Sequence, residues 1–243
     1  MLFRRVTREE KLNNKMIEAA KAGDIKWIKK LLEQGGEVDA RDNGRRTAMV
    51  WAAQYGKLNV VKHLVEQGAE VDARDKDGRT AMMWAALNGQ LDVVKHLVEH
   101  GAEVDAKDKD GWTAMMWAAA DGYLDVVKFL AEHGAEIDAG NNGWTATMCA
   151  VQHRKTDVVK FLAERGADLS LKNGEGKTAE MLARERGHKE IVDYLDTLTQ
   201  FKDRTEGIGK TNGSSLELKP EIRNMLRTEQ EYNAAKHGVS YAV

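Results

Sequence analysis

The feature that most constrains this chain of 243 residues is a segment of about 33 residues that recurs along it. Residues 75–107 and 108–140 are identical at 25 of 33 positions. A period of this length indicates a linear array of small units, each packed on its neighbours, rather than one large core. Aromatic residues at 6% and charged residues at 31% fit many shallow cores. The copies share a Thr-Ala pair, at Thr47, Thr80, Thr113, Thr145 and Thr178.

Within one copy the residues predict two short helices and a turn-rich loop. Thr80 can cap a helix over 81–87, because its hydroxyl accepts a free backbone N–H. Gly89 suits the end of that helix. A second helix over 91–99 follows, ended by Gly101, and the D-K-D-G stretch suits a tight turn. The second helix has an apolar stripe, formed by Leu91, Val94, Leu97 and Val98.

These residues resemble the ankyrin repeat, whose unit runs D-x-x-G-x-T-P-L-H-x-A-A, a glycine, a V-V-x-L-L helix and then G-A-x-V-N-A. The resemblance covers roughly residues 9–198, or about six repeats including atypical terminal caps. In this chain Ala replaces the Pro and Met the Leu. The His position holds Trp51, Trp84, Trp117 and then Cys149.

The resemblance implies an all-α solenoid of stacked helix-turn-helix units with β-hairpin loops, plus a C-terminal extension. We expect an N-terminal segment and capping repeat at 1–41 and four internal repeats at 42–172. A C-terminal capping repeat at 173–198 precedes a linker and short amphipathic helical tail at 199–243. Residues 201–215 have the composition of a flexible linker.

Composition and charge exclude several classes of protein. One cysteine excludes a disulfide framework. Lys and Arg number 37 against 39 Asp and Glu, which disfavours a general polyanion binder. No apolar segment follows the basic N-terminus and no run of about 18 apolar residues occurs, so we expect no secretory signal, no membrane span and a cytoplasmic protein.

Neither a metal site nor a catalytic site is predicted. His63 and His96 are 33 residues apart, but Phe129, Phe161 and Tyr194 continue their register, which favours a packing ladder. The two G-x-G-K-T stretches, 174–178 and 207–211, lack the glycine that a phosphate-binding loop needs four residues earlier. We expect no cofactor. The register of Trp51, Trp84 and Trp117 predicts that they fill the core between repeats, and Cys149 shares it as a buried apolar residue.

The resemblance implies that hairpin tips and inner helices line a concave partner-binding face. Trp112 and Trp144 occupy a hairpin position that holds Arg46, Arg79 or Lys177 elsewhere, so we expect them to be exposed binding anchors. The wider face includes Arg74, Lys76 and Lys107. The predicted partner-binding residues are Arg46, Tyr55, Arg79, Leu87, Asn88, Lys109, Trp112, Asp121, Trp144, Gln152, His153 and Arg154.

The predicted function is a non-catalytic protein–protein interaction module, acting as a scaffold or inhibitor. Its partner would be another protein, and the chain a monomer unless the tail mediates association. One alternative is nucleotide or RNA recognition by the exposed tryptophans with nearby basic residues, although the charge balance disfavours nucleic acid. The other makes residues 201–243 the binding element, through a short apolar stripe formed by Ile222, Met225, Leu226 and Tyr232.

Overall fold

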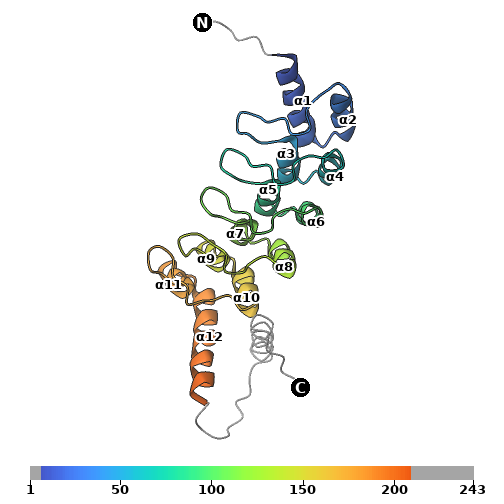
Figure 1. The fold of residues 1–243 in the computed structure, drawn as a ribbon. Coiled ribbons are helices and arrows are strands. Elements are labelled where there is room, and N and C mark those ends of the chain that lie inside the picture. Colours follow the sequence, from blue (N-terminus) through green and yellow to red (C-terminus); the bar gives the residue numbers. More distant parts are fainter. Residues whose placement is uncertain (1–6, 209–243) are drawn as a thin grey trace, which may run out of the picture. The chain divides into compact units, whose positions relative to one another are not determined.

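The computed structural model describes residues 7–208, which contain α-helices and no regular strand within that range (Figure 1). The chain divides into an N-terminal unit, residues 1–136, and a C-terminal unit, residues 137–243. The helices are α1 (Arg8–Ala22), α2 (Ile25–Glu33), α3 (Ala48–Gln54), α4 (Leu58–Glu66), α5 (Ala81–Leu87), α6 (Leu91–Glu99), α7 (Ala114–Asp121), α8 (Leu124–Glu132), α9 (Ala146–Gln152), α10 (Thr156–Glu164), α11 (Ala179–Glu185) and α12 (Lys189–Ile208).

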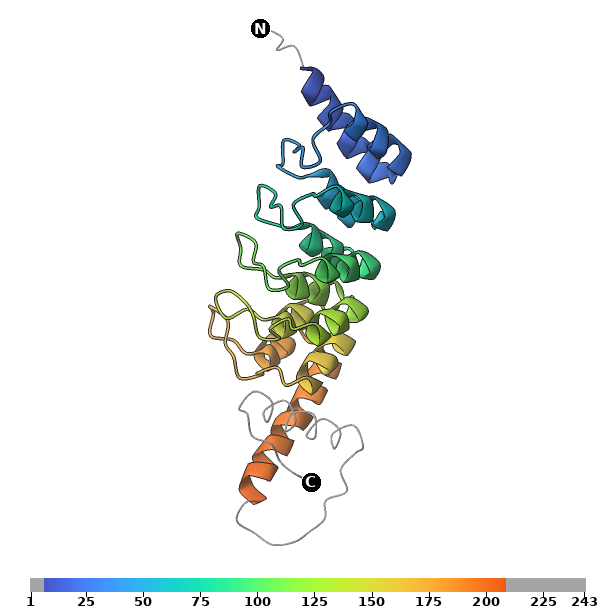
Figure 2. The same ribbon diagram turned by 45° about the vertical axis from the view of Figure 1, so that its right-hand side comes forward.

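In the N-terminal unit the helices form two parallel rows (Figures 1 and 2). The first helices of successive repeats, α1, α3, α5 and α7, pack in one row, and α2, α4, α6 and α8 pack in the other. The loops that connect one repeat to the next project beside the first row. The predicted all-α solenoid of helix-turn-helix units is therefore confirmed within this unit.

The threonine of each repeat begins the first helix as predicted. Thr80 has an extended backbone, and its hydroxyl accepts the Met83 backbone N–H at 3.4 Å. The same bond recurs at each of the other copies. Because a helix of seven residues is unstable alone, this cap and the packing of its buried side chains must define α5. Ala81, Met82 and Ala85 are among those buried side chains.

Polar bonds link the loop that follows the second helix of one repeat to the corresponding loop of the next repeat. An aspartate within one loop accepts a backbone N–H from the loop one repeat later, at 3.0–3.3 Å. These loop N–H groups lie outside any helix or sheet, so the aspartate side chains supply the acceptors that they need. The pairs are Asp39 with Glu70, Asp72 with Glu103, Asp105 with Glu136 and, in the C-terminal unit, Asp138 with Asp168.

The loops have hairpin form without regular strands. In the repeat of α5, the Asp75 N–H donates to the Arg79 carbonyl and the Gly78 N–H to the Asp75 carbonyl. Gly78 has φ +81°, a left-handed conformation that glycine adopts readily. Arg45 takes the same place in the preceding hairpin with φ +60°, so this hairpin holds a side chain where glycine is favoured.

The described part of the C-terminal unit contains two helical pairs in which α9 packs on α11 and α10 on α12. The last helix, α12, runs to Ile208 and not to residue 198, which corrects the prediction of a linker from residue 201. No glycine or proline stands between Lys189 and Glu206, so nothing in this stretch ends the helix. The predicted tail-binding residues Ile222, Met225, Leu226 and Tyr232 lie outside the described residues.

Within residues 7–208, no helix is both long enough and apolar enough to cross a bilayer.

Candidate functional site

Three tryptophans of the N-terminal unit form a row in which every indole is bonded to an aspartate of its own hairpin. We call Trp51, Trp84 and Trp117 the tryptophan row. Their indole N–H groups donate to Asp42, Asp75 and Asp108 at 3.0, 3.0 and 3.2 Å. Only Trp51 is buried, whereas Trp84 and Trp117 are half-buried. The prediction that all three fill the core is therefore correct for Trp51 and only partly correct for the other two.

Each of these aspartates also holds the turn of its hairpin. In Asp108, Oδ1 accepts the backbone N–H groups of Asp110 and Trp112 at 3.0 and 2.9 Å, while Oδ2 accepts the Trp117 indole. The Asp108 side chain is only 1% exposed, and the Arg79 guanidinium lies 3.8 Å away. One buried carboxylate thus ties the hairpin, the first helix and the preceding repeat together.

The predicted site residues Arg46 and Arg79 lie over this row. The Arg46 guanidinium is 3.7 Å from the centroid of the Trp51 ring, and Arg79 is 5.2 and 4.7 Å from those of Trp84 and Trp117. These are cation–π distances. Arg79 therefore bridges two repeats, and both arginines are partly committed to the fold.

The structure corrects the expectation that Trp112 and Trp144 are freely exposed. Both are half-buried, and Trp112 packs on Trp117 of its own repeat with ring centroids 4.4 Å apart. A neighbouring indole shields Trp112, which the register alone does not reveal. Tyr55, in contrast, is 49% exposed while stacked on Trp51 at 6.0 Å.

The remaining predicted residues of this unit lie at the ends of first helices. Leu87 is half-buried at the end of α5, and the Asn88 amide donates to the Trp84 carbonyl at 2.8 Å. Asp121 is exposed as the last residue of α7. Leu87 and Asp121 are accessible to a partner, whereas Asn88 also caps its own helix.

Lys109 lies in a groove lined by three successive hairpins of the N-terminal unit, which we call the cationic groove. Five of the eight lining residues are basic, and the two carboxylates, Asp75 and Asp108, are buried within their own hairpins. Its volume is about 430 Å³. The lining residues are Arg45, Arg74, Asp75, Lys76, Gly78, Lys107, Asp108 and Lys109.

Backbone contacts make this groove a fixed feature. The Lys76 N–H donates to the Gly44 carbonyl at 2.8 Å, and the Lys109 N–H to the Asp77 carbonyl at 3.0 Å. Arg74 donates to the Lys107 carbonyl at 2.6 Å. None of the ion pairs recorded within residues 7–208 occupies the side chains of Arg45, Lys76 or Lys109. Sequence reasoning placed the lysines on this face but missed Arg45, which its turn position carries into the groove.

In the C-terminal unit the four predicted residues lie at the two ends of α9: Trp144 precedes the helix, Gln152 is its last residue, and His153 and Arg154 follow it. The Trp144 side chain is half-buried, and the Trp144 backbone N–H donates to the Asn141 carbonyl at 2.9 Å. His153 is exposed, and one ring nitrogen donates to the Cys149 carbonyl at 3.1 Å. Exposed Arg154 has φ +56°, a strained value for a residue other than glycine, and Gln152 is half-buried.

Two groups near the predicted site residues, the Asp42 carboxyl and the Cys149 thiol, have pKa values shifted from their ordinary values. Burial raises the pKa of Asp42, but hydrogen bonds from the Arg46 backbone and the Trp51 indole outweigh it, so the pKa lies below its ordinary value of 3.8. The bonds of Asp42 therefore stabilise the fold above that value and are lost as the pH falls through the lower, folded-state pKa. Burial raises the pKa of Cys149 to about 12, so this thiol stays protonated and unreactive at neutral pH.

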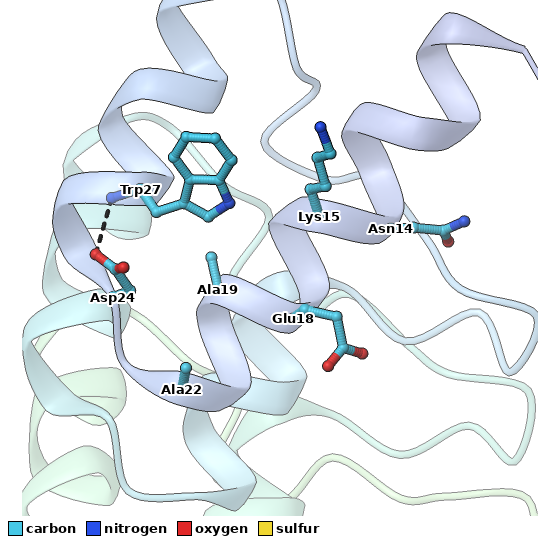
Figure 3. A pocket seen from close by; sticks show the side chains of 7 residues that line it. All are labelled: Asn14, Lys15, Glu18, Ala19, Ala22, Asp24 and Trp27. Carbon is cyan, nitrogen blue, oxygen red and sulfur yellow. Dashed lines mark hydrogen bonds between the residues drawn. The ribbon is translucent and has the colours of Figure 1, made fainter.

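A second groove, of about 360 Å³, lies between α1 and α2 (Figure 3). The Trp27 indole and Lys15 extend on the same side of it, and the small side chains of Ala19 and Ala22 lie between the two helices. Lys15 and Lys30 are 6.0 and 5.3 Å from the centroid of the Trp27 ring. The chain's own cations therefore already contact this aromatic surface.

Comparison with known proteins identifies the repeats. A family model described as ankyrin repeats (3 copies) matches residues 16–108, 102–173 and 138–205. A search of curated proteins found no match to the chain. The count of about six repeats stays a prediction.

Proposed function

Because the chain belongs to the ankyrin-repeat family, whose repeats generally mediate protein–protein interactions, we propose that its N-terminal unit binds an acidic segment of a partner protein in the cationic groove. The observation that carries this proposal is the arrangement of five basic side chains around two carboxylates that are already bonded within the hairpins. Charge complementarity of this kind steers association and favours acidic partners. No catalytic role is proposed.

The tryptophan row supports protein recognition over base stacking. A base would need an open indole face, but Arg46 lies 3.7 Å from the centre of the Trp51 ring and Arg79 lies over both Trp84 and Trp117. An acidic side chain, in contrast, can accept hydrogen bonds from these guanidinium groups in their present positions over the rings. The covered indole faces therefore disfavour recognition of RNA by base stacking.

The groove can be tested with charge reversals at two of its three exposed lysines. We expect Lys76→Glu combined with Lys109→Glu to weaken binding of a fluorescent poly-glutamate peptide about tenfold or more, equivalent to about 1.4 kcal/mol. The matched control is Lys26→Glu with Lys29→Glu, which makes the same charge change at exposed positions of α2. Fluorescence anisotropy at several salt concentrations measures both.

The control variant should bind like the wild type. Equal losses in both double variants would show that only net charge matters and would contradict a specific groove. An RNA oligonucleotide that binds more tightly than the peptide, and depends on the same lysines, would favour the nucleic-acid function instead.

The role of Trp112 can be separated from its packing. Arg46 and Arg79 occupy the same hairpin position, so Trp112→Arg replaces the indole with a residue that this fold already places over a tryptophan. We expect the free energy of unfolding to change by about 1 kcal/mol or less. If Trp112 anchors the partner, capture of that partner from lysate should fall by about 30-fold or more.

Unchanged capture by Trp112→Arg would assign Trp112 to packing on Trp117. Partner capture by Tyr55→Ala, compared with capture by the wild type, tests the exposed aromatic ring that stacks on Trp51. Loss of capture with that variant alone would move the anchor to the end of α3.

A further inference from the structure

The side chains of His96, Glu99 and His100 come together at the C-terminal end of α6, where Glu99 is the last helical residue and His100 caps the helix. Their ligand atoms all lie within 4.8 Å of one another, and the two imidazole rings are 4.0 Å apart between centroids. The spacing of three and four residues puts them on one face of the helix. Sequence comparison by repeat register missed this set, because it compared His96 with residues 33 positions away and not with its own helical turn.

The hydrogen bonds of His100 leave one ring nitrogen suited to bind a metal. His100 Nδ1 is 2.8 Å from the His96 carbonyl oxygen, which can only accept, so Nδ1 carries the proton. In the neutral ring, Nε2 then keeps a free lone pair. A histidine that ligates a metal commonly donates its other N–H to a carbonyl in this way.

His96 supplies an independent observation. Its Nε2 is shielded from solvent and has no hydrogen-bond partner among the described residues. A buried polar atom without a partner is costly, and coordination would satisfy it. Glu99 and His100 are exposed, so an ion can reach the cluster from solvent.

We propose that His96, Glu99 and His100 form a Zn²⁺ site at the C-terminal end of α6. Two imidazole nitrogens and a carboxylate are common zinc ligands, and three protein ligands leave a fourth position for water or for a group from another molecule. Burial lowers the pKa of His96, and the charges of His100 and Lys62 add to this effect while those of Glu99 and Glu66 oppose it. The site is independent of the cationic groove.

Neighbouring helices provide matched variants for the test. In α4 the corresponding residues are His63, Glu66 and Gln67, and in α8 they are Phe129, Glu132 and His133. His100→Gln therefore gives α6 the set of α4, and His96→Phe gives it the set of α8, each of which this fold already accommodates.

The experiment measures Zn²⁺ binding to the full chain by isothermal titration calorimetry, with circular dichroism as the check on folding. We expect one site in the wild type and a loss of affinity of about tenfold or more in each single variant. Gln67→His, at an exposed position, should complete a second set on α4 and raise the stoichiometry from one to two. Absence of binding in the wild type, or binding that persists in both single variants, would overturn the proposal.

Discussion

Replacing Asp108 with alanine should destabilise the protein by about 3–4 kcal/mol, because a buried carboxylate that accepts three hydrogen bonds is removed at once. Two of its donors are the backbone N–H groups of Asp110 and Trp112, and the third is the Trp117 indole. Removal also leaves the Arg79 guanidinium without its nearest carboxylate, 3.8 Å away. Urea unfolding followed by circular dichroism measures the change.

The chain itself suggests the more discriminating variant. In the last hairpin Asn173 replaces the aspartate, and its Oδ1 still accepts two backbone N–H groups at 3.0 Å, but the residue in the tryptophan position is Leu182. The hairpin that has asparagine in place of aspartate thus has leucine in place of tryptophan, and leucine has no indole N–H to donate. Asp108→Asn should keep both turn bonds and lose the bond to Trp117 together with the ion pair to Arg79.

A double-mutant cycle isolates that bond. We expect Asp108→Asn to cost about 1–2 kcal/mol in the wild type and much less in a Trp117→Leu background, which gives a coupling energy of about 1 kcal/mol or more. The same cost in both backgrounds would show that the indole bond contributes nothing and that the cost of Asp108→Asn comes from the lost ion pair with Arg79.

The second large effect is expected at Gly143, in the hairpin before α9, where the Thr-Ala pairs of neighbouring copies are 32 residues apart and not 33. Gly143 has φ +75°, and a Cβ added there would collide with the carbonyl oxygen of Lys172, with the carbonyl carbon at 2.9 Å and the Asn173 Cα at 3.0 Å. All three atoms are backbone, so no side chain can rotate away. We expect Gly143→Ala to cost about 3 kcal/mol or more, combining strain with the displaced hairpin.

Gly176 is the matched control because it has the same φ, +75°, and nothing within 4 Å of an added Cβ. Gly176→Ala should therefore cost only the left-handed backbone strain, about 1–2 kcal/mol. The two variants differ in space and not in conformation. Equal losses of unfolding free energy would refute the collision and leave backbone strain as the whole effect.

The sequence predicted the helices well because their signals are local. The ranges 81–87 and 91–99 coincide with α5 and α6, since a threonine cap and a glycine stop lie within the same few residues. The end of α12 was missed because a polar composition at residue 201 suggested a linker, although no helix-breaking residue occurs before Gly207.

The candidate site was less predictable because it depends on contacts between residues that the chain folds together. Nine residues separate Asp108 from Trp117, and only the closed hairpin brings carboxylate and indole to 3.2 Å. The half-burial of Trp112 has the same cause, since Trp117 covers it. The groove was anticipated in part, because the exposed lysines follow from register, while Arg45 enters it through an unusual backbone angle.

The bonds between successive loops have a consequence for how the gene can change. If residues 75–107 were lost, Arg74 would join Asp108, and Asp72 would meet the N–H of Glu136 in place of that of Glu103. Each partner is replaced by its counterpart one step later. Unequal recombination between the two near-identical segments can therefore shorten or lengthen the protein by 33 residues without creating a junction that the fold has not already built.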